Sequence, residues 1–438
     1  MSGPLLALVI AGALLLLALV TSPVGPTPRA ALSLGAVAVL AIFVPPALAL
    51  LLAVGVIAAT VVDAIAAREA PRVTREVATT LSRGVTSPLV VECARRGGLT
   101  VRLRQPRVPD LAVEPPEATG RIDARLVPRR RGRHELPGVA VRATGPLGLA
   151  AWTRPGPGPA EVLVFPDLPA ARRLALAVRK GRFRDPGQLS RGPLGLGTEF
   201  ESIRDYTTDD DIRQVNWRAT ARLGRPMSNQ FRVEQDRDVI CVVDCGRLMA
   251  APIEDRTRLD AAVDAVAAVA LVADEVGDRC GVVAFDSEIR RRLAPRRSGG
   301  DGVVRAVFDL EPRGVDSDYE LAFRTVAGGK RAFVLVLTDL LEEVAARPLV
   351  EAVPYLARRH AVVVASVSDP DLGSSVATPP RSTRDVYAAA VALDVLDARA
   401  LVAAQLRGVG ADVVEAAPGS LGAACVAAYL KAKTRGQL

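Results

Sequence analysis

Two aspartates follow short apolar runs in the C-terminal half of the chain. Asp244 comes directly after Val239–Val243, and Asp339 comes directly after Ala332–Thr338. A third acidic group, Asp316–Asp318, precedes the second run. If both runs are strands of one parallel sheet, these oxygens gather at its carboxyl edge, where α/β proteins bind ligands. Oxygen ligands suit a hard divalent cation such as magnesium. The alternative is that Asp244 and Asp339 simply cap the helices or turns that follow them.

The sequence contains few residues that could form other catalytic or metal-binding sites. The two histidines are His134, in a basic run, and His360, at the end of a predicted helix, and the chain contains no CxxC or HExxH motif. Zinc chemistry and a Ser/His/Asp arrangement are therefore not expected. The cysteines are odd in number and widely spaced, which indicates buried thiols in a reducing compartment. They are Cys93, Cys241, Cys245, Cys280 and Cys425.

The elements that must position Asp244 and Asp339 alternate along the chain beyond Asp238. Apolar runs of buried-strand length alternate with segments of helical periodicity, which predicts a mainly parallel sheet covered by helices on both faces. Thr257 and Asp260 have the spacing of a capping box at the start of the first helix. The expected strands are Val239–Val243, Gly281–Phe285, Ala332–Thr338, Ala361–Ser366 and Asp412–Val414; the expected helices are Thr257–Val276, Glu342–Arg359, Arg384–Arg407 and Ser420–Lys433.

The middle of the chain has a different periodicity. From Arg72 to Phe165, short alternating stretches are separated by Gly, Pro and Arg turns, which predicts a small antiparallel β-sandwich. Within it, Pro128–His134 is a dense basic run, expected as a solvated hairpin turn or else as a phosphate or lipid-headgroup contact. The Gly181–Gly197 segment is rich in Gly, Pro and Arg and is expected to be a linker, not a phosphate loop.

The N-terminal region is the most apolar part of the chain. Leu5–Val20 and Ala30–Val62 are uncharged, and Pro45 and Pro46 interrupt the second run. A span of the bilayer needs about 20 helical residues, so the first run is slightly short, and the second is long for one span and short for two. The proline pair is either a kink in one helix or the turn of a hairpin. Both two and three spans remain open, and three is the expected number.

Charge sets the expected orientation. Several arginines follow the last apolar residue, which predicts a multi-pass plasma-membrane protein whose large C-terminal part is cytoplasmic. These arginines are Arg68, Arg72, Arg75 and Arg83. The net charge of +8 is consistent with a membrane protein, and the chain has no basic helix or RNA-binding signature, so no nucleic-acid partner is expected.

One further segment, Gly197–Arg222, mixes acidic and basic residues with Tyr206 and Trp217. A solvated, salt-bridged surface would explain the charges, with at most ~1 kcal/mol from each pair. A tryptophan among charges instead favours an internal network or a docking face for a partner.

The C-terminal region resembles a von Willebrand factor type A-like domain. Such domains carry a metal-ion-dependent adhesion site built from Asp-x-Ser-x-Ser, a distant Thr and a distant Asp. Asp244 matches the first position, Ser317 fits the Thr position, and Asp339 fits the last Asp. Gly246 and Leu248 stand where the two serines should be. The resemblance therefore implies a degenerate site with no firmly held cofactor and only weak magnesium binding.

The Gly197–Arg222 segment resembles the signature of the domain-of-unknown-function-58 family, with Asp209 and Asn216 in place of the usual Gly and Asp. Gly145–Leu149 also looks like this family. The resemblance implies a membrane-tethered, non-enzymatic protein-interaction module, an adaptor or chaperone-like partner of a MoxR-type AAA+ ATPase. The residues that match the signature include Glu199, Phe200, Arg204, Tyr206, Asp210, Asp211, Arg213, Trp217 and Arg222.

These observations predict four regions: a transmembrane anchor (1–67), a β-sandwich-like domain (68–166), a linker with the signature segment (167–237) and a type A-like α/β domain (238–438).

Two other functions fit less well. A metal-dependent adhesion or receptor domain would need the opposite topology. A metal-dependent hydrolase would need a general base, which the Asp cluster does not supply.

Overall fold

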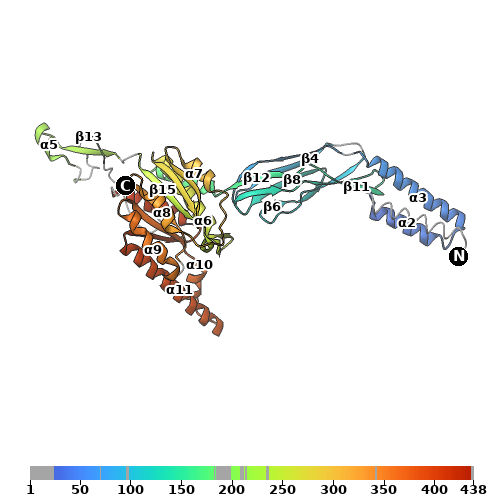
Figure 1. The fold of residues 1–438 in the computed structure, drawn as a ribbon. Helices are drawn as coiled ribbons and strands as arrows, with labels where there is room; N and C mark the ends of the chain where they lie inside the picture. Colours follow the sequence, from blue (N-terminus) through green and yellow to red (C-terminus); the bar gives the residue numbers. More distant parts are fainter. Residues whose placement is uncertain are drawn as a thin grey trace. The chain divides into compact units, whose positions relative to one another are not determined.

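The computed structural model describes residues 24–69, 71–94, 98–181, 183, 199–207, 212, 215–232, 236–340 and 343–435. The chain divides into two compact units, Met1–Val164 and Phe165–Leu438 (Figure 1). The apolar Leu5–Val20 run and most of the expected Gly181–Gly197 linker lie outside the described residues.

In the first unit, two apolar helices form a hairpin. Helix α2 (Pro28–Leu40) and helix α3 (Pro46–Ala66) pack against each other, and Pro45 is the N-cap residue of α3 (Figure 1). The proline pair is thus the turn of a hairpin and not a kink within one helix. Helix α3 is long and apolar enough to cross a membrane, whereas α2 is a shorter apolar helix.

The rest of this unit consists of antiparallel sheets, as predicted for this region. One sheet has the order β1-β11-β10-β5-β7, a second β2-β4-β8-β6 and a third β3-β12-β9, and side chains from all three share one apolar core. Arg131, inside the basic run between β8 and β9, is buried and not solvated. The strands are β1 (Val24–Pro26), β2 (Val73–Val77), β3 (Thr80–Ser82), β4 (Ser87–Cys93), β5 (Thr100–Arg104), β6 (Leu111–Glu114), β7 (Glu117–Thr119), β8 (Arg121–Pro128), β9 (Gly132–Leu136), β10 (Ala140–Thr144), β11 (Ala150–Pro155) and β12 (Ala160–Phe165).

The second unit contains a six-stranded sheet of order β19-β18-β15-β20-β21-β22. Its strands are parallel except for the edge strand β19, which runs antiparallel to β18. The strand order reverses at β15, so the crevice at the carboxyl ends of β15 and its neighbours is the expected ligand position. The strands are β15 (Asp238–Asp244), β18 (Arg279–Phe285), β19 (Ile289–Arg296), β20 (Ala332–Leu337), β21 (Ala361–Val367) and β22 (Ala411–Ala416).

Helices cover both faces of this sheet, as the Val-rich strands predict. One apolar core lies between the sheet and α4, α6, α7 and α12; the other lies between the sheet and α8, α9 and α11. The helices are α4 (Leu168–Arg179), α6 (Arg258–Glu275), α7 (Gly300–Val307), α8 (Tyr319–Ala327), α9 (Glu343–Ala357), α10 (Pro370–Ala377), α11 (Thr383–Gly408) and α12 (Leu421–Thr434). A short 3-10 turn, η2 (Arg247–Ala250), follows β15, and β16 (Pro252–Ile253) pairs with β17 (Arg256–Thr257) before α6.

Two local features of the second unit test predictions that were made from the sequence. The capping box of α6 is present, with Thr257 and Asp260 bonded reciprocally, which confirms that prediction. The segment expected to be a linker begins instead with helix α4. Asp167 caps α4 by accepting from the Ala170 N–H, and the apolar side of α4 is buried in the core against α6.

The signature segment forms an element of its own within the described residues. Strand β13 (Glu199–Asp205) pairs antiparallel with β14 (Met227–Arg232), and the short helix α5 (Trp217–Leu223) lies between them in sequence (Figure 1). We call β13, α5 and β14 the signature arm.

Candidate functional site

Asp244, the last residue of β15, is buried and accepts hydrogen bonds from several groups of its own chain. The Ser317 hydroxyl and the Gly246 N–H (2.8 Å) donate to its Oδ1. The hydroxyls of Tyr319 (3.0 Å) and Thr338 (2.7 Å) donate to its Oδ2. Both carboxylate oxygens are therefore satisfied within the fold, which is what a buried charge requires.

The glycine at position 246 makes this arrangement fit. A Cβ placed on Gly246 would overlap Ser317 Oγ and would lie 2.9 Å from the carbonyl oxygen of Val315. Ser317 thus occupies the space that a side chain at position 246 would need. The resemblance leads one to expect a serine at position 246. In this structure the hydroxyl of Ser317, from a distant loop, takes the place of the hydroxyl that such a serine would supply.

Tyr319 stays a hydrogen-bond donor in this cluster. Burial first, and then the charge of Asp244, raise the pKa of the Tyr319 phenol well above its ordinary value. The phenol is therefore protonated at neutral pH. The Tyr319 and Thr338 oxygens also lie 2.9 Å apart, but each hydroxyl has one proton, so the shared feature of the three hydroxyls is Asp244 as their acceptor.

Asp339, which follows β20, lies in a different network. Its Oδ1 accepts from Arg258 (2.6 Å) and Arg399 (3.0 Å), and both arginines are buried. The Ser366 hydroxyl also lies 3.3 Å from this oxygen. Arg399 further donates to the carbonyl of Val367 (2.9 Å). This ion network ties α6, α11 and the ends of β20 and β21 together.

The structure therefore brings two of the three expected metal ligands, Asp244 and Ser317, into contact, but gives Asp339 two guanidinium partners. Two adjacent positive charges disfavour a cation near Asp339. Leu248, in η2, is partly buried and has no ligand atom. Over the described ranges, no group of three or more His, Cys, Asp or Glu side chains is placed to hold a metal ion. The donor set does not fit a tightly bound magnesium ion.

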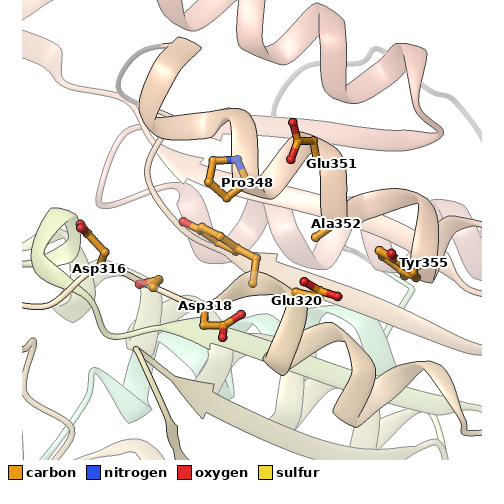
Figure 2. Close-up of a pocket in the computed structure, with 9 residues that line it drawn as sticks. Asp316, Asp318, Glu320, Pro348, Glu351, Ala352 and Tyr355 are labelled. Carbon is orange, nitrogen blue, oxygen red and sulfur yellow. The ribbon is translucent and has the colours of Figure 1, made fainter.

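An acidic pocket of about 460 Å³ adjoins the Asp244 network (Figure 2). Ser317 and Tyr319 line it, and its acidic side chains come from the start of α8 and from α9. Tyr355 and Pro348 of α9 add apolar surface. The pocket suits a basic or polar group better than an anion. Its acidic residues are Asp316, Asp318, Glu320 and Glu351.

Part of the acidic lining is already neutralised or used structurally. Asp316 pairs with Arg247, and Glu320 pairs with Arg324. Asp318 is the N-cap of α8, and its side chain accepts a hydrogen bond from the Leu321 N–H (2.9 Å). The side chains that the sequence did not single out are Tyr319, Thr338, Arg258 and Arg399. A lone arginine in the apolar stretch of α11 was the one available signal for Arg399.

The structure describes only some of the signature residues. Glu199 and Phe200 belong to β13, Arg204 is exposed in the same strand, and Tyr206 is partly buried just after it. Arg222 is exposed on α5. Asp210, Asp211 and Arg213 fall outside the described residues.

Trp217 is 69% exposed at the start of α5, which favours a docking face over an internal network as the role of this ring. Three other apolar side chains of the same segment are also exposed. They are Ile203, Ile212 and Leu223. An exposed tryptophan on a short, charged element is typical of a binding surface.

Asn216, where the family pattern has Asp, has two roles in the arm. Its side-chain oxygen accepts from the Ala219 N–H (2.9 Å) and so caps α5. Its amide N–H donates to the side chain of Asn229 in β14 (2.8 Å). An aspartate could cap the helix, but it could not donate this second bond.

Comparison with known proteins places these features in a family context. Residues 202–374 match the family described as "Protein of unknown function DUF58". This range runs from the signature arm through β21 to α10. The chain is 28% identical over 307 residues to "Uncharacterized protein Rv1480" of Mycobacterium tuberculosis (strain ATCC 25618 / H37Rv), covering 62% of this chain and 92% of that protein. "Uncharacterized protein Mb1516" of Mycobacterium bovis matches with the same identity and coverage.

Proposed function

We propose that this protein is a membrane-tethered, non-enzymatic protein-interaction module. In this proposal the helical hairpin and the preceding apolar run anchor it in the cell membrane, and the α/β unit works in the cytoplasm. The arginines that follow α3 support this orientation through the positive-inside rule. The described cysteines are all buried free thiols, which is in keeping with a reducing compartment.

The α/β unit is proposed to be a von Willebrand factor type A-like domain with a degenerate metal site. Support comes from its strand order, from the antiparallel edge strand β19, and from Asp244 at the end of its first strand. The acidic residues at the carboxyl edge are engaged by the protein itself: Asp244 by hydroxyls and Asp339 by arginines. Such an edge is better suited to holding the fold than to catalysis.

The observation that carries the proposal is the exposure of Trp217 on the signature arm. Exposing an indole to water is unfavourable, and large aromatic side chains contribute most of the affinity in many interfaces. Arg218 and Arg222, one helical turn apart, are exposed on the same short helix. The arm therefore offers an exposed aromatic side chain on a basic helix. We propose that its partner is an AAA+ ATPase of the MoxR type, as the family resemblance implies.

To test this proposal, the full chain is solubilised from its own membranes in mild detergent, and the proteins that co-purify with it are identified. Wild type should retain a MoxR-type ATPase, and Trp217→Ala should weaken binding at least about tenfold, as expected for an interface anchor. Tyr387→Ala is the matched control, because Tyr387 on α11 is 70% exposed, almost the same as Trp217. It should bind like wild type.

Two outcomes would count against the proposal. If wild type enriches no ATPase, the partner assignment fails. If Trp217→Ala and Tyr387→Ala bind equally well, the arm is not the docking surface.

A further inference from the structure

The hairpin of α2 and α3 is fixed to the antiparallel sheets at one end only. Asp63, in the last turn of α3, is buried and accepts from the backbone N–H groups of Leu147 (2.7 Å), Leu149 (2.7 Å) and Ala150 (2.8 Å). A Cβ on Gly145 would overlap Asp63, so the glycine is what allows this approach. The Gly145–Leu149 segment is therefore a receptor loop for the end of α3.

The start of α2 is held by the same loop. The Thr27 N–H donates to the carbonyl of Leu149 (2.9 Å), and its hydroxyl donates to that of Gly148. Strand β1, immediately before Thr27, pairs with β11. The Trp152 indole N–H donates to the carbonyl of Ala64 (2.9 Å). Both ends of the hairpin thus lie at one loop, and its turn is the opposite, free end.

That free end is entirely apolar. No charged residue occurs from Ala30 to Val62, and the side chains of Ile42 (76%) and Phe43 (79%) at the turn are exposed. The hydroxyls of this stretch, Ser33 and Thr60, donate to carbonyls of their own helices. Pro45 and Pro46 have no N–H to leave unsatisfied, which lowers the cost of burying the turn in hydrocarbon.

Helix α3 is long enough to cross a bilayer, but α2 is too short to complete a second crossing. Helix α2 has 13 residues, which rise about 20 Å at about 1.5 Å per residue. In α3, the stretch from Pro46 to Val62 rises about 25 Å before the clamped Asp63. A hydrocarbon core is about 30 Å thick. Basic side chains and the Trp152 indole lie at the clamped end, where Arg154 covers the Trp152 ring at 4.4 Å, as expected at headgroup level.

We infer that α2 and α3 form a re-entrant hairpin: it enters the lipid bilayer from the side of the antiparallel sheets, keeps its apolar turn inside the bilayer, and leaves on the same side. The occupant of the exposed apolar surface is lipid. This inference rests on the proposed membrane tether and specifies its topology. It adds no crossing to the chain, whatever the Leu5–Val20 run contributes.

The test is labelling with a charged, membrane-impermeant maleimide in right-side-out and inside-out vesicles that hold the full chain. The native cysteines are buried, and the unmodified chain measures their background. Arg68→Cys, just beyond α3, should react from one side of the membrane. Ile42→Cys at the turn should react from neither side, and should react fully once detergent dissolves the vesicles. Phe43→Cys repeats the measurement if Ile42→Cys accumulates poorly.

The other outcomes are distinct. Reaction of Ile42→Cys from the side opposite to Arg68→Cys would show that the hairpin crosses the membrane, which overturns the inference but leaves the tether intact. Reaction from the same side as Arg68→Cys would place the hairpin in water and overturn the inference. Release of the whole chain by alkaline carbonate would instead refute the proposed tether itself.

Discussion

Gly246 is the residue on which the Asp244 network depends most directly. Gly246→Ala should destabilise the protein by about 1–3 kcal/mol, because the new methyl group overlaps Ser317 Oγ and crowds the Val315 carbonyl. In a Ser317→Ala background the same substitution should cost less, since the overlapping hydroxyl is gone. Urea unfolding of the two single variants and the double variant measures this coupling. Strict additivity would show that Ser317 does not occupy the space beside Gly246.

The same network limits magnesium binding. Asp244 and the neighbouring hydroxyls leave most of an octahedral shell to water, and Asp339 is held by Arg258 and Arg399. We expect a Kd of about 1 mM or weaker, so about 1 mM magnesium should stabilise the fold by under about 0.5 kcal/mol. Melting curves with and without magnesium, repeated on Asp244→Ala, check this. A clear upward shift in wild type that is absent from the variant would show a working metal site.

At the scale of elements, the arm and the sheet should respond differently to loss of an aromatic ring. Trp217→Ala should change the free energy of unfolding by no more than about 0.5 kcal/mol, because the ring is mostly exposed. Phe333→Ala in β20 is the comparison: that ring is fully buried, and its loss should cost about 3–5 kcal/mol. Chemical denaturation of the α/β unit measures both. A large cost for Trp217→Ala would mean that the arm packs against a surface.

Elements with a clear apolar period could be predicted from the sequence, and elements without one could not. Helix α6 and the central strands are buried along most of their length, so their apolar residues form patterns that identified them. Strand β19 reads IRRRLAPR, and its largely exposed side chains hide an edge strand among charges. Helix α4 was missed because its buried face consists largely of alanines between arginines, which provides little contrast in hydropathy.

The residues of the candidate site could likewise be predicted only where the sequence marks them locally. Asp244 was found because it stands at the end of a recognisable strand, and Ser317 was found through the resemblance to the type A-like adhesion site. Arg258 and Arg399 meet Asp339 across 81 and 60 positions of the chain. Such contacts depend on how α6 and α11 pack on the sheet, and no local pattern records this. Similarly, Asp63 meets its receptor loop 84 to 87 positions away.

At the scale of the whole molecule, the two units have separate apolar cores, one within the antiparallel sheets and two on the faces of the α/β sheet. The exposed apolar side chains of the first unit are concentrated on the hairpin. Membrane attachment and the fold of the α/β unit should therefore be separable.

Deleting residues 1–67 tests this separation. The truncated chain should be soluble, because it loses the hairpin and retains surfaces of ordinary polarity. The antiparallel sheets should lose about 1–3 kcal/mol, since β1 no longer pairs with β11 and Asp63 no longer accepts from its receptor loop. The α/β unit should unfold as before. Fractionation after a high-salt wash, followed by calorimetry of the soluble protein, measures both effects. A truncated chain that stays in the membrane pellet would place the tether elsewhere, and an equal loss of stability in the α/β unit would show that the two units fold as one.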